Sequence, residues 1–535
     1  MPGNFSGKKT LRGVTTGQRP GNGTGKGAEK RGKEVPETAH RFAQRHGRGA
    51  GGHGKEAGRT GGRTGDGKRA AGQAARWGGQ VGRSDWTGGG TGGGKRANSE
   101  KSAATEKPAK AKKRTKAEKR TKAEKPAKDE KPAKDEKWDQ CREKSGARAR
   151  AEAPFSPPFS YLWSIMAGIY LHIPFCKRFC AYCDFYKSAR LELLPPMVEA
   201  MLRELDARLG ELDGEPLRTL YFGGGTPSLC PPETLQRFID RILERRPDAA
   251  FEEVTVEANP DDLTPDYLAR LSRTCINRLS IGIQSFDDGC LRMMNRRHTA
   301  RQALEALHEA HRAGFRNLTA DLIFGIPGFG EEPLRRSLGQ LLEAGVEHVS
   351  AYHLTIEPGT AFGRREARGA LHAVDEEQSV REFQLVHETL TRAGFEHYEV
   401  SNFARPGFRA RHNSAYWSGD PYLGIGPAAH SYDGAVRRWN PSSVEGYLAG
   451  EEGGSERLTE RDRYNEYVMT ALRTAEGIDL ERLAARFGPH RLESVRRTAE
   501  RFIRAGELAE RGGRLAIPPE RFLVSDDVIE HFFET

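Results

Sequence analysis

The feature that most constrains the fold is a repeat of strand and helix patterns that begins at residue 168. Short runs of β-branched and aromatic residues alternate with amphipathic stretches, and Gly, Pro or Asn turns separate them. The expected strands are 168–173, 218–222, 253–257, 278–283, 318–324 and 348–354. Six such units predict an α/β protein, a partial (β/α)6 barrel whose parallel strands are wrapped by helices. In this architecture, functional side chains gather at the carboxyl ends of the strands.

Helical patterns fill the gaps between these strands and return near the end of the chain. Apolar residues three and four apart predict helices at 195–209, 232–246, 264–273, 300–313 and 332–344. Beyond residue 440 the pattern predicts helices at 462–474, 480–487 and 493–505, two short strands within 508–517, and a last helix at 526–533. Helices followed by a small hairpin predict a winged-helix-like accessory domain.

The segment before Met166 has a composition that argues against a packed core. Residues 1–165 hold 39 Lys and Arg against 17 Asp and Glu, with 30 of the 62 glycines, whereas the rest carries 46 basic and 57 acidic side chains. With few large apolar residues, the segment does not offset about 1–2 kcal/mol per residue of backbone entropy. Its hexad repeat at 114–137 has no apolar face and is interrupted by Pro126 and Pro132. We therefore expect a disordered, basic, low-complexity extension.

This division of charge limits the classes of function. The body after Met166 has a net charge of −11, which excludes a nucleic-acid binder that is basic throughout. For the extension, three interpretations stay open: a basic arm that contacts nucleic acid or anionic lipid, an inert tail, or translated DNA upstream of the true start. No signal peptide or membrane span is expected, because the apolar run 161–173 is shorter than the ~20 residues that cross a bilayer. We expect a cytoplasmic protein, with peripheral contact at the inner face of the membrane as a further interpretation.

Three cysteines crowd directly after the first expected strand, in the segment YLHIPFCKRFCAYCDF. Cys176, Cys180 and Cys183 have the spacing C-x-x-x-C-x-x-C. Thiolates are soft ligands for zinc or for iron–sulfur clusters, so this loop predicts a metal site. A zinc site needs a fourth ligand, for which His172 is the candidate. A 4Fe-4S cluster on three cysteines leaves one iron open to a small molecule, and three buried free thiols remain the alternative without metal.

This segment resembles the radical S-adenosylmethionine (SAM) superfamily, and its flanks resemble oxygen-independent coproporphyrinogen III oxidase and its relatives. In that family, the amino and carboxylate groups of SAM chelate the open iron. The later motifs GGGTPS, VEANP, SIGIQSF, NRR and DLIFGIPG match in order. Taken singly, each polar residue in them is explained equally well by hydrogen bonding or packing. The resemblance implies that SAM contacts Tyr170, Tyr182, Gly224, Gly225, Thr226, Glu257, Gln284, Arg296 and Asp321.

Two departures from the oxidase pattern favour another branch of the family. The oxidases resemble C-x-x-x-C-x-x-C-x-C, whereas this chain has Phe185 at the last position. The motif HNSAYW is similar to the H-N-x-x-Y-W of HemW haem chaperones, which pass haem to haem-dependent respiratory enzymes. The resemblance implies a role in haem binding for His412, Asn413, Tyr416 and Trp417, since imidazole is a common haem ligand and aromatic rings offer flat apolar faces. Alternatively, His412 and Asn413 cap a turn while the two aromatic residues pack in the core.

The sequence thus predicts a haem chaperone with a 4Fe-4S cluster, SAM and haem. The expected partners are haem-accepting respiratory proteins, an electron donor for the cluster and a second copy of the chain in a homodimer. Two alternatives are a radical SAM coproporphyrinogen III oxidase and a zinc-stabilised binding protein, so enzymatic activity stays open. Relatives begin near the first strand, which makes Met166 the expected native start. The predicted domains are the extension 1–165, the radical SAM core 166–400, a connecting region with the HNxxYW motif at 401–450, and a C-terminal domain at 451–535.

Overall fold

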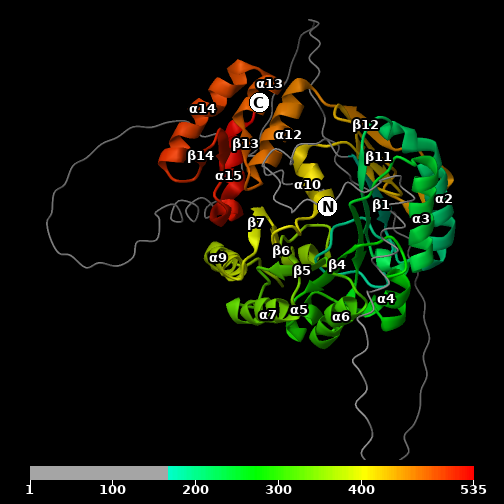
Figure 1. Cartoon of the computed structure of the whole chain (residues 1–535). Helices are drawn as coiled ribbons and strands as arrows, with labels where there is room; N and C mark the ends of the chain where they lie inside the picture. Colours follow the sequence, from blue (N-terminus) through cyan, green and yellow to red (C-terminus); the bar gives the residue numbers. More distant parts are fainter. Residues whose placement is uncertain (1–166) are drawn as a thin grey trace, which may run out of the picture. The chain divides into compact units, whose positions relative to one another are not determined.

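The computed structural model describes residues 167–535, and its centre is a parallel sheet of six strands (Figure 1). The strands pair in sequence order, each parallel to the next. This order confirms the predicted partial (β/α)6 barrel. The expected disorder of the extension falls outside the described residues. The six strands are β1 (Ala167–Ile173), β2 (Leu217–Gly224), β3 (Glu253–Ala258), β4 (Arg278–Gln284), β5 (Leu318–Phe324) and β6 (His348–His353).

Helices cover the outer face of this sheet, as Figure 1 shows for α2, α3, α4, α6 and α7. Local sequence signals set their ends. Thr299 forms a capping box with Gln302 at the start of α6, and α7 ends at Gly345, which has φ of 72°. The helices between residues 194 and 392 are α2 (Leu194–Arg208), α3 (Pro232–Arg245), α4 (Pro265–Leu271), α5 (Asp288–Met293), α6 (Ala300–Arg312), α7 (Glu331–Ala344), α8 (Ala361–Glu366) and α9 (Glu376–Arg392).

The sheet is wider than the sequence predicted, with twelve strands in the described residues. At one edge β9 (Tyr422–Ile425) lies parallel to β1, and β10 (His430–Tyr432), β11 (Val436–Trp439) and β12 (Gly454–Arg457) follow antiparallel. At the other edge β8 (Asn402–Ala404) pairs with β6, and β7 (Glu396–Glu399) is outermost. The sheet therefore extends beyond residue 450, where we placed the start of the C-terminal domain. Helix α10 (Arg411–Ser418) precedes β9, and α11 (Val444–Ala449) lies between β11 and β12.

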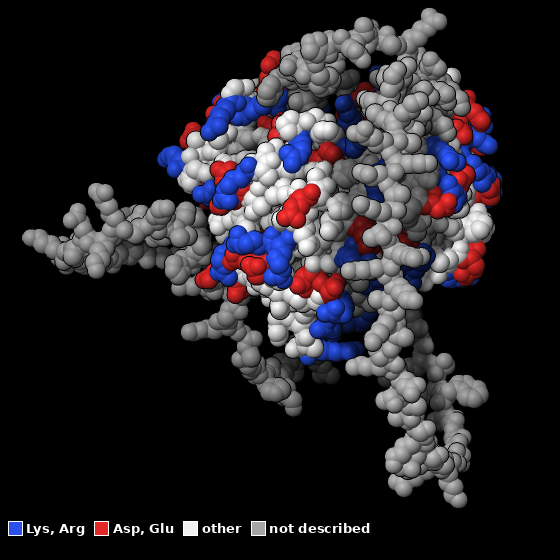
Figure 2. All heavy atoms as spheres, turned by 60° about the horizontal axis from the view of Figure 1, so that its bottom comes forward, with Lys and Arg blue, Asp and Glu red and all other residues white. Residues whose placement is uncertain are grey.

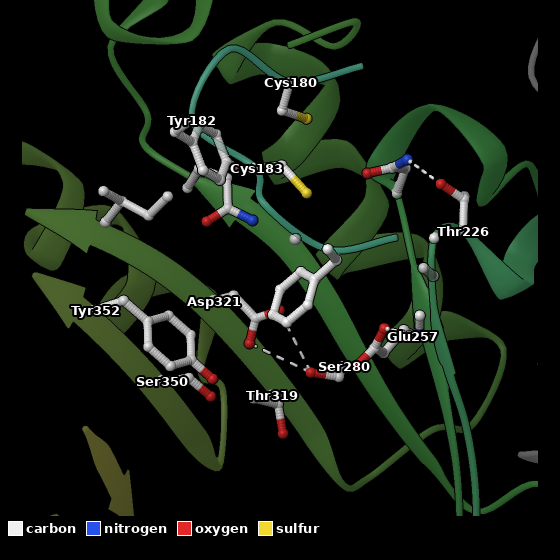
Figure 3. Close-up of a pocket in the computed structure, with 18 of the residues that line it drawn as sticks. Cys180, Tyr182, Cys183, Thr226, Glu257, Ser280, Thr319, Asp321, Ser350 and Tyr352 are labelled. Atoms are coloured by element: carbon white, nitrogen blue, oxygen red, sulfur yellow. Dashed lines mark hydrogen bonds between the residues drawn. The ribbon is translucent and has the colours of Figure 1, made fainter. Parts of the chain in front are cut away.

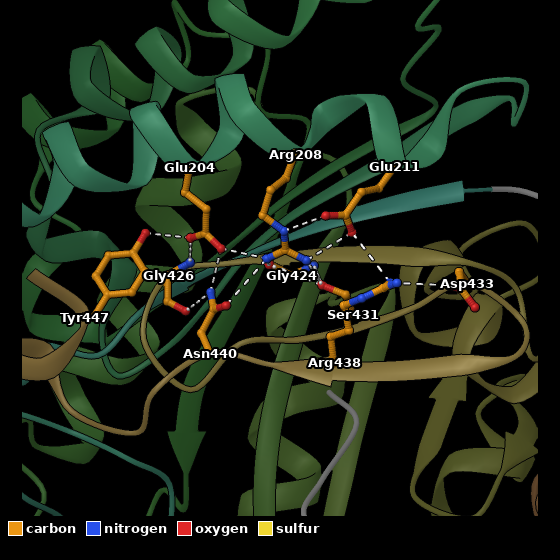
Figure 4. A network of polar contacts seen from close by, with 10 residues as sticks. All are labelled: Glu204, Arg208, Glu211, Gly424, Gly426, Ser431, Asp433, Arg438, Asn440 and Tyr447. Carbon is orange, nitrogen blue, oxygen red and sulfur yellow. Dashed lines mark hydrogen bonds and ion pairs between the residues drawn. The ribbon is translucent and has the colours of Figure 1, made fainter. Parts of the chain in front are cut away.

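A network of polar contacts joins this extra sheet to α2 (Figure 4). The Glu204 carboxylate accepts hydrogen bonds from Arg208 at 2.7 Å and from the Tyr447 hydroxyl at 2.6 Å. It also accepts from the backbone N–H of Gly426 at 2.9 Å and from the Asn440 amide at 2.7 Å. One carboxylate on α2 thus satisfies donors from two loops of the β9–β12 region, which fixes that region against the barrel.

The C-terminal residues form the predicted helix and hairpin arrangement. A two-residue strand pairs with the hairpin, so the small sheet has three antiparallel strands instead of the expected two. The order of helices and hairpin confirms the winged-helix-like expectation. Its elements are α12 (Glu460–Leu472), β13 (Ile478–Asp479), α13 (Leu480–Phe487), α14 (Pro489–Arg504), β14 (Ala509–Arg511), β15 (Arg514–Ala516) and α15 (Ser525–Ile529).

The two faces of the barrel sheet have opposite character. Along β4, Leu279, Ile281 and Ile283 belong to the main hydrophobic core, whereas Ser280 and Gln284 line the barrel interior. Successive side chains of a strand point to opposite faces, so the apolar core lies between the sheet and its helices. The barrel interior is polar as a result, and a cavity remains there.

Surface charge in the described residues is mixed. Basic and acidic side chains are interspersed over the face shown in Figure 2. This pattern differs from the basic stripe of a nucleic-acid binder. None of the helices described in 167–535 is both long enough and apolar enough to span a bilayer.

Candidate functional site

A cavity of about 480 Å³ lies inside the barrel (Figure 3). It extends from the carboxyl ends of the strands to residues at their amino ends, among them Arg278 and His348. It brings together the cysteine loop, the glycine-rich loop after β2 and polar side chains at the ends of β3 to β6. Tyr170 is one layer deeper, where its ring stacks near Tyr221 and His412. The predicted residues that line the cavity are Cys176, Cys180, Tyr182, Cys183, Gly224, Gly225, Thr226, Glu257, Gln284, Arg296, Asp321 and Asn413.

The three cysteine side chains face this cavity, and hydrogen-bond donors are directed at two of their sulfurs. The Thr226 hydroxyl donates to Sγ of Cys176 at 3.4 Å, and Arg296 Nη1 donates to Sγ of Cys180 at 3.2 Å. Burial raises the pKa of Cys176 to about 11 and also raises the pKa of Cys183. Metal binding by these thiols therefore displaces protons.

This set of donors fits a 4Fe-4S cluster better than a zinc ion. Three cysteine thiolates, two of which accept an O–H or N–H bond, are typical of iron–sulfur ligation, and the cavity beside them would leave room for a ligand of the cluster. The zinc alternative relied on His172. Its Nδ1 shares a hydrogen bond of 3.1 Å with the Tyr170 hydroxyl, and its buried Nε2 has no hydrogen-bond partner among the described residues. In the part of the chain from 167 to 535, no three His, Cys, Asp or Glu side chains converge on a single metal ion.

Several residues that support the cysteine loop were not among the predicted site residues. Asn295, with φ of 58°, donates through its amide to the Phe179 carbonyl at 2.7 Å. Lys187 Nζ donates to the Cys183 carbonyl at 2.7 Å, and Lys177 pairs with Asp262 at 2.7 Å. The sequence did contain signals for these residues. Asn295 is the first residue of the NRR motif, and Lys177 and Lys187 are the only two lysines after residue 166.

The glycine-rich loop needs its glycines for close packing. A Cβ at Gly225 would lie 2.6 Å from the Pro174 carbonyl carbon, and Gly224 has φ of 110°. Both positions therefore reject a side chain. The loop lies against the cysteine segment as a result, and the Gly224 N–H donates to Glu257 at 3.1 Å.

Two half-buried carboxyl groups, those of Glu257 and Asp321, face the cavity. Burial raises the pKa of Glu257 to about 7 and that of Asp321 to about 6. Glu257 accepts from the Tyr221 hydroxyl at 2.8 Å, and Asp321 accepts from the Ser280 hydroxyl at 3.2 Å. Near neutral pH these groups exchange between neutral and charged forms, so they can either donate to or accept from a polar ligand.

Backbone strain marks Gln284, at the end of β4. Its φ is 67°, a left-handed conformation that is uncommon outside glycine, and the β4–β5 register shifts between Gly282 and Gln284. Such strain persists where the surrounding structure imposes it and clusters at ligand sites. Here it turns the amide side chain into the cavity.

The HNxxYW motif forms α10, which closes the floor of the barrel. His412 is 2% exposed, and burial lowers its pKa to about 3. Its Nδ1 bonds to the Thr219 hydroxyl at 2.9 Å and its Nε2 to the Tyr416 hydroxyl at 2.9 Å. Asn413 lines the cavity, and Trp417 is half-buried. The contact of these residues with haem stays a prediction.

The start of α10 differs from the turn that we considered for His412 and Asn413. The backbone N–H groups of Arg411 and His412 donate to the Glu253 carboxylate at 2.9 and 3.0 Å. A carboxylate at a helix N-terminus satisfies free N–H groups and complements the helix dipole. The buried acid on β3 therefore supplies this cap.

Comparison with known proteins places this geometry in context. The model of the Radical SAM superfamily matches residues 170–341, and that of the HemN C-terminal domain matches 458–524. The heme chaperone HemW of Mycobacterium tuberculosis is 38% identical over 372 residues, covering 68% of this chain and 93% of that protein. The heme chaperone HemW of Escherichia coli is 35% identical over 317 residues, covering 58% and 83%.

A solved structure shares the fold. Coproporphyrinogen III oxidase (HemN) from Escherichia coli, described as a radical SAM enzyme, aligns with a TM-score of 0.59. The alignment covers 70% of this chain and 91% of the oxidase, at 21% identity. At that identity the likeness concerns the fold alone.

Proposed function

This chain belongs to the HemW family of haem chaperones within the radical SAM superfamily, and we propose that it binds haem and transfers it to haem-dependent respiratory proteins. The observation that carries this proposal is the 38% identity with the heme chaperone HemW of Mycobacterium tuberculosis across 93% of that protein. Related haem chaperones from several bacteria match over most of their length as well. The function therefore rests on relatives that share both the barrel and the C-terminal region.

The cavity supplies the sites for the two cofactors that the superfamily implies. Cys176, Cys180 and Cys183 would hold the cluster, which when bound provides a single electron. The glycine-rich loop, Glu257 and Asp321 would orient SAM through hydrogen bonds, and Arg296 would stabilise the Cys180 thiolate.

Phe185 argues against oxidase activity and in favour of the proposed chaperone function. The oxidase pattern has a further cysteine at that position, whereas here a 38% exposed phenylalanine lines the cavity next to Cys183. Coproporphyrinogen III oxidation remains the second candidate, favoured by the shared fold alone.

The same proposal implies a cellular location and partner proteins. We place it in the cytoplasm, with peripheral contact at the inner membrane face where respiratory acceptors receive haem. An electron donor would reduce the cluster from the open side of the cysteine loop, and a homodimer remains a prediction that light scattering can check.

Anaerobic reconstitution with iron and sulfide, followed by two assays, tests the function. We expect broad visible absorption from a cluster, saturable binding of haemin, and negligible decarboxylation of coproporphyrinogen III with SAM and a reductant. A Cys176→Ser variant should lose the cluster absorption. Robust coproporphyrinogen turnover by the wild-type protein would replace the chaperone with an oxidase.

A further inference from the structure

The exposed side of the cysteine loop has a charge opposite to that of the body. Segments 177–190 and 292–297 carry seven basic residues and one acidic residue, Asp184, whereas the body after Met166 has a net charge of −11. Both lysines of the body are among the seven. The basic residues are Lys177, Arg178, Lys187, Arg190, Arg292, Arg296 and Arg297.

The two segments lie side by side in the fold. The Ala181 N–H donates to the Met294 carbonyl at 3.0 Å, and the loop also accepts hydrogen bonds from Asn295 and Arg296. The end of α5 and the turn after it are therefore packed against the cysteine loop. Positive charge from both segments collects around the cysteines.

Part of this charge is neutralised within the molecule. Lys177 pairs with Asp262 at 2.7 Å, and Arg297 pairs with Asp261 at 2.9 Å. Arg190 also has acidic partners. These three cations are therefore committed to the fold.

Three other cations of the two segments form no ion pair within residues 167–535. Arg178 and Arg292 are exposed, and Lys187 donates only to the carbonyls of Cys183 and Phe185. Their positive charges are therefore available to an acidic partner from outside the molecule.

Two apolar side chains are exposed on the same loop. Phe179 and Phe185 are 41% and 38% exposed, and they flank Cys180 and Cys183 in the chain. Lys187 Nζ lies 5.6 Å from the centroid of the Phe179 ring, so apolar and cationic groups share one surface. Exposed aromatic residues with charged neighbours are typical of a protein–protein interface. We define the loop rim as Arg178, Phe179, Phe185, Lys187 and Arg292.

The chemistry of the loop indicates which partner fits the rim. A cluster on Cys176, Cys180 and Cys183 would take up one electron in the proposed function. The part of the chain that the structure describes offers no second metal site that could relay this electron. The electron must therefore come from another molecule that reaches the loop. A membrane surface also attracts basic and aromatic side chains, but lipids supply no electron.

We propose that the loop rim docks a small acidic protein that carries one electron. This inference rests on the proposed function and names the chemistry of the electron donor. Opposite charges speed the encounter and orient the two surfaces, and Phe179 and Phe185 then form the apolar centre of the contact. One electron passes from the reduced carrier to the cluster, so the carrier is oxidised by one electron and the cluster is reduced by one. No bond forms or breaks, and no proton moves.

Binding and reduction by two acidic carriers, a flavodoxin and a 2Fe-2S ferredoxin, test this inference on the full-length, reconstituted protein. For at least one carrier, we expect the affinity for its oxidised form and the rate of cluster reduction by its reduced form to fall about tenfold between about 50 and about 300 mM salt. Arg178→Glu combined with Arg292→Glu should lower both about tenfold at low salt. Arg178→Lys combined with Arg292→Lys keeps the charge and should stay near the wild type.

Two controls separate docking from damage to the loop. Photoreduced deazaflavin, a small uncharged reductant, should reduce the cluster of the double Glu variant at the wild-type rate. Arg497→Glu combined with Arg504→Glu makes the same change of charge at two exposed positions of α14, and should bind and accept electrons like the wild type.

Three results would overturn the inference. The first is that the wild type binds neither carrier, or that the double Glu variant binds and is reduced as the wild type is. The second is loss of binding only to vesicles with one-third phosphatidylglycerol, which would assign the rim to a membrane. The third is loss of self-association alone in sedimentation, which would assign the rim to a second copy of the chain.

Haemin binding distinguishes these failures from failure of the proposed function. A wild-type protein that binds haemin and fails the carrier tests would keep the chaperone function and lose the docking surface. A wild-type protein that forms a cluster, passes the carrier tests and binds no haemin would lose the chaperone function and keep the docking surface.

Discussion

Two carboxyl side chains of the cavity, Glu257 and Asp321, have pKa values above those of the same groups in water. Desolvation in the cavity wall raises the pKa of Glu257 to about 7, so the folded protein binds a proton more tightly there than the unfolded chain does. Asp321 is raised to about 6 for the same reason. A raised carboxyl pKa stabilises the fold where the group is protonated, and this stability is lost as pH rises through the folded pKa. The metal-free protein should therefore become less stable between pH 5 and pH 8.

The Glu257→Gln variant tests this effect. Glutamine keeps the shape and carries no charge, so the variant should lose the part of the pH dependence that comes from Glu257. A shift from 4.5 to about 7 corresponds to about 3 kcal/mol of unfolding free energy at high pH. Urea unfolding of the metal-free protein at pH 5.5 and 8 measures it. Equal pH dependence in variant and wild type would contradict a buried, titrating Glu257.

The same variant bears on ligand binding. Ionised Glu257 accepts hydrogen bonds, so a ligand that donates to it should bind more weakly as pH falls below 7. We expect SAM affinity of the wild type to decline over that range and that of Glu257→Gln to be lower and flat, as measured by isothermal titration.

At the scale of elements, long periodic segments were predictable and short paired ones were not. β5 and α13 coincide with their predicted bounds because their apolar pattern spans several residues. β7 to β12 have three or four residues each, too few for a pattern, and their pairing depends on distant strands. The cap of α10 was unpredictable for the same reason, because the capping residue Glu253 precedes the helix by more than 150 residues. Most of the predicted residues that line the cavity could be found from the sequence, because each belongs to a short motif of consecutive residues.

Removal of the α10 cap is a prediction at this scale. Glu253 is 3% exposed, and beyond the two N–H groups it lies 3.8 Å from the buried Arg278 guanidinium. Glu253→Gln keeps one acceptor oxygen and removes the charge. We expect a loss of about 1–3 kcal/mol in unfolding free energy. Hydrogen exchange should quicken at residues 411–418, with Glu244→Gln on the exposed end of α3 as the matched control. Unchanged protection of α10 would show that the cap does not hold the helix.

For the whole molecule, the charge division separates two parts of the chain. All residues that we place in the cavity and in the HNxxYW motif lie between 170 and 417, within the acidic body. The basic segment 1–165 falls outside the described residues and contributes none of them. Hydrophobic residues make up only 36% of the complete chain, but this figure includes the extension. It does not describe residues 167–535, whose barrel has an extensive apolar core.

A chain that begins at Met166 tests this separation. Loss of the segment removes a net charge of +22, so the isoelectric point should fall below 7. Cluster content and haemin affinity should stay within about twofold of the full-length values, because the binding residues are retained. Isoelectric focusing and haemin titration measure both. A tenfold loss of haemin affinity would assign the extension a part in haem binding.

The most direct measurement of the central claim is haem transfer. Haem-loaded, cluster-containing protein would be mixed with the apo form of a b-type cytochrome under anaerobic conditions, and the cytochrome spectrum followed over time. The account predicts that the cytochrome acquires haem from the loaded protein faster than from haem-loaded serum albumin at the same concentration, and that the Soret band of the chaperone declines in step. A protein that binds haem and never yields it to the acceptor, or that yields it no faster than albumin, would contradict the account.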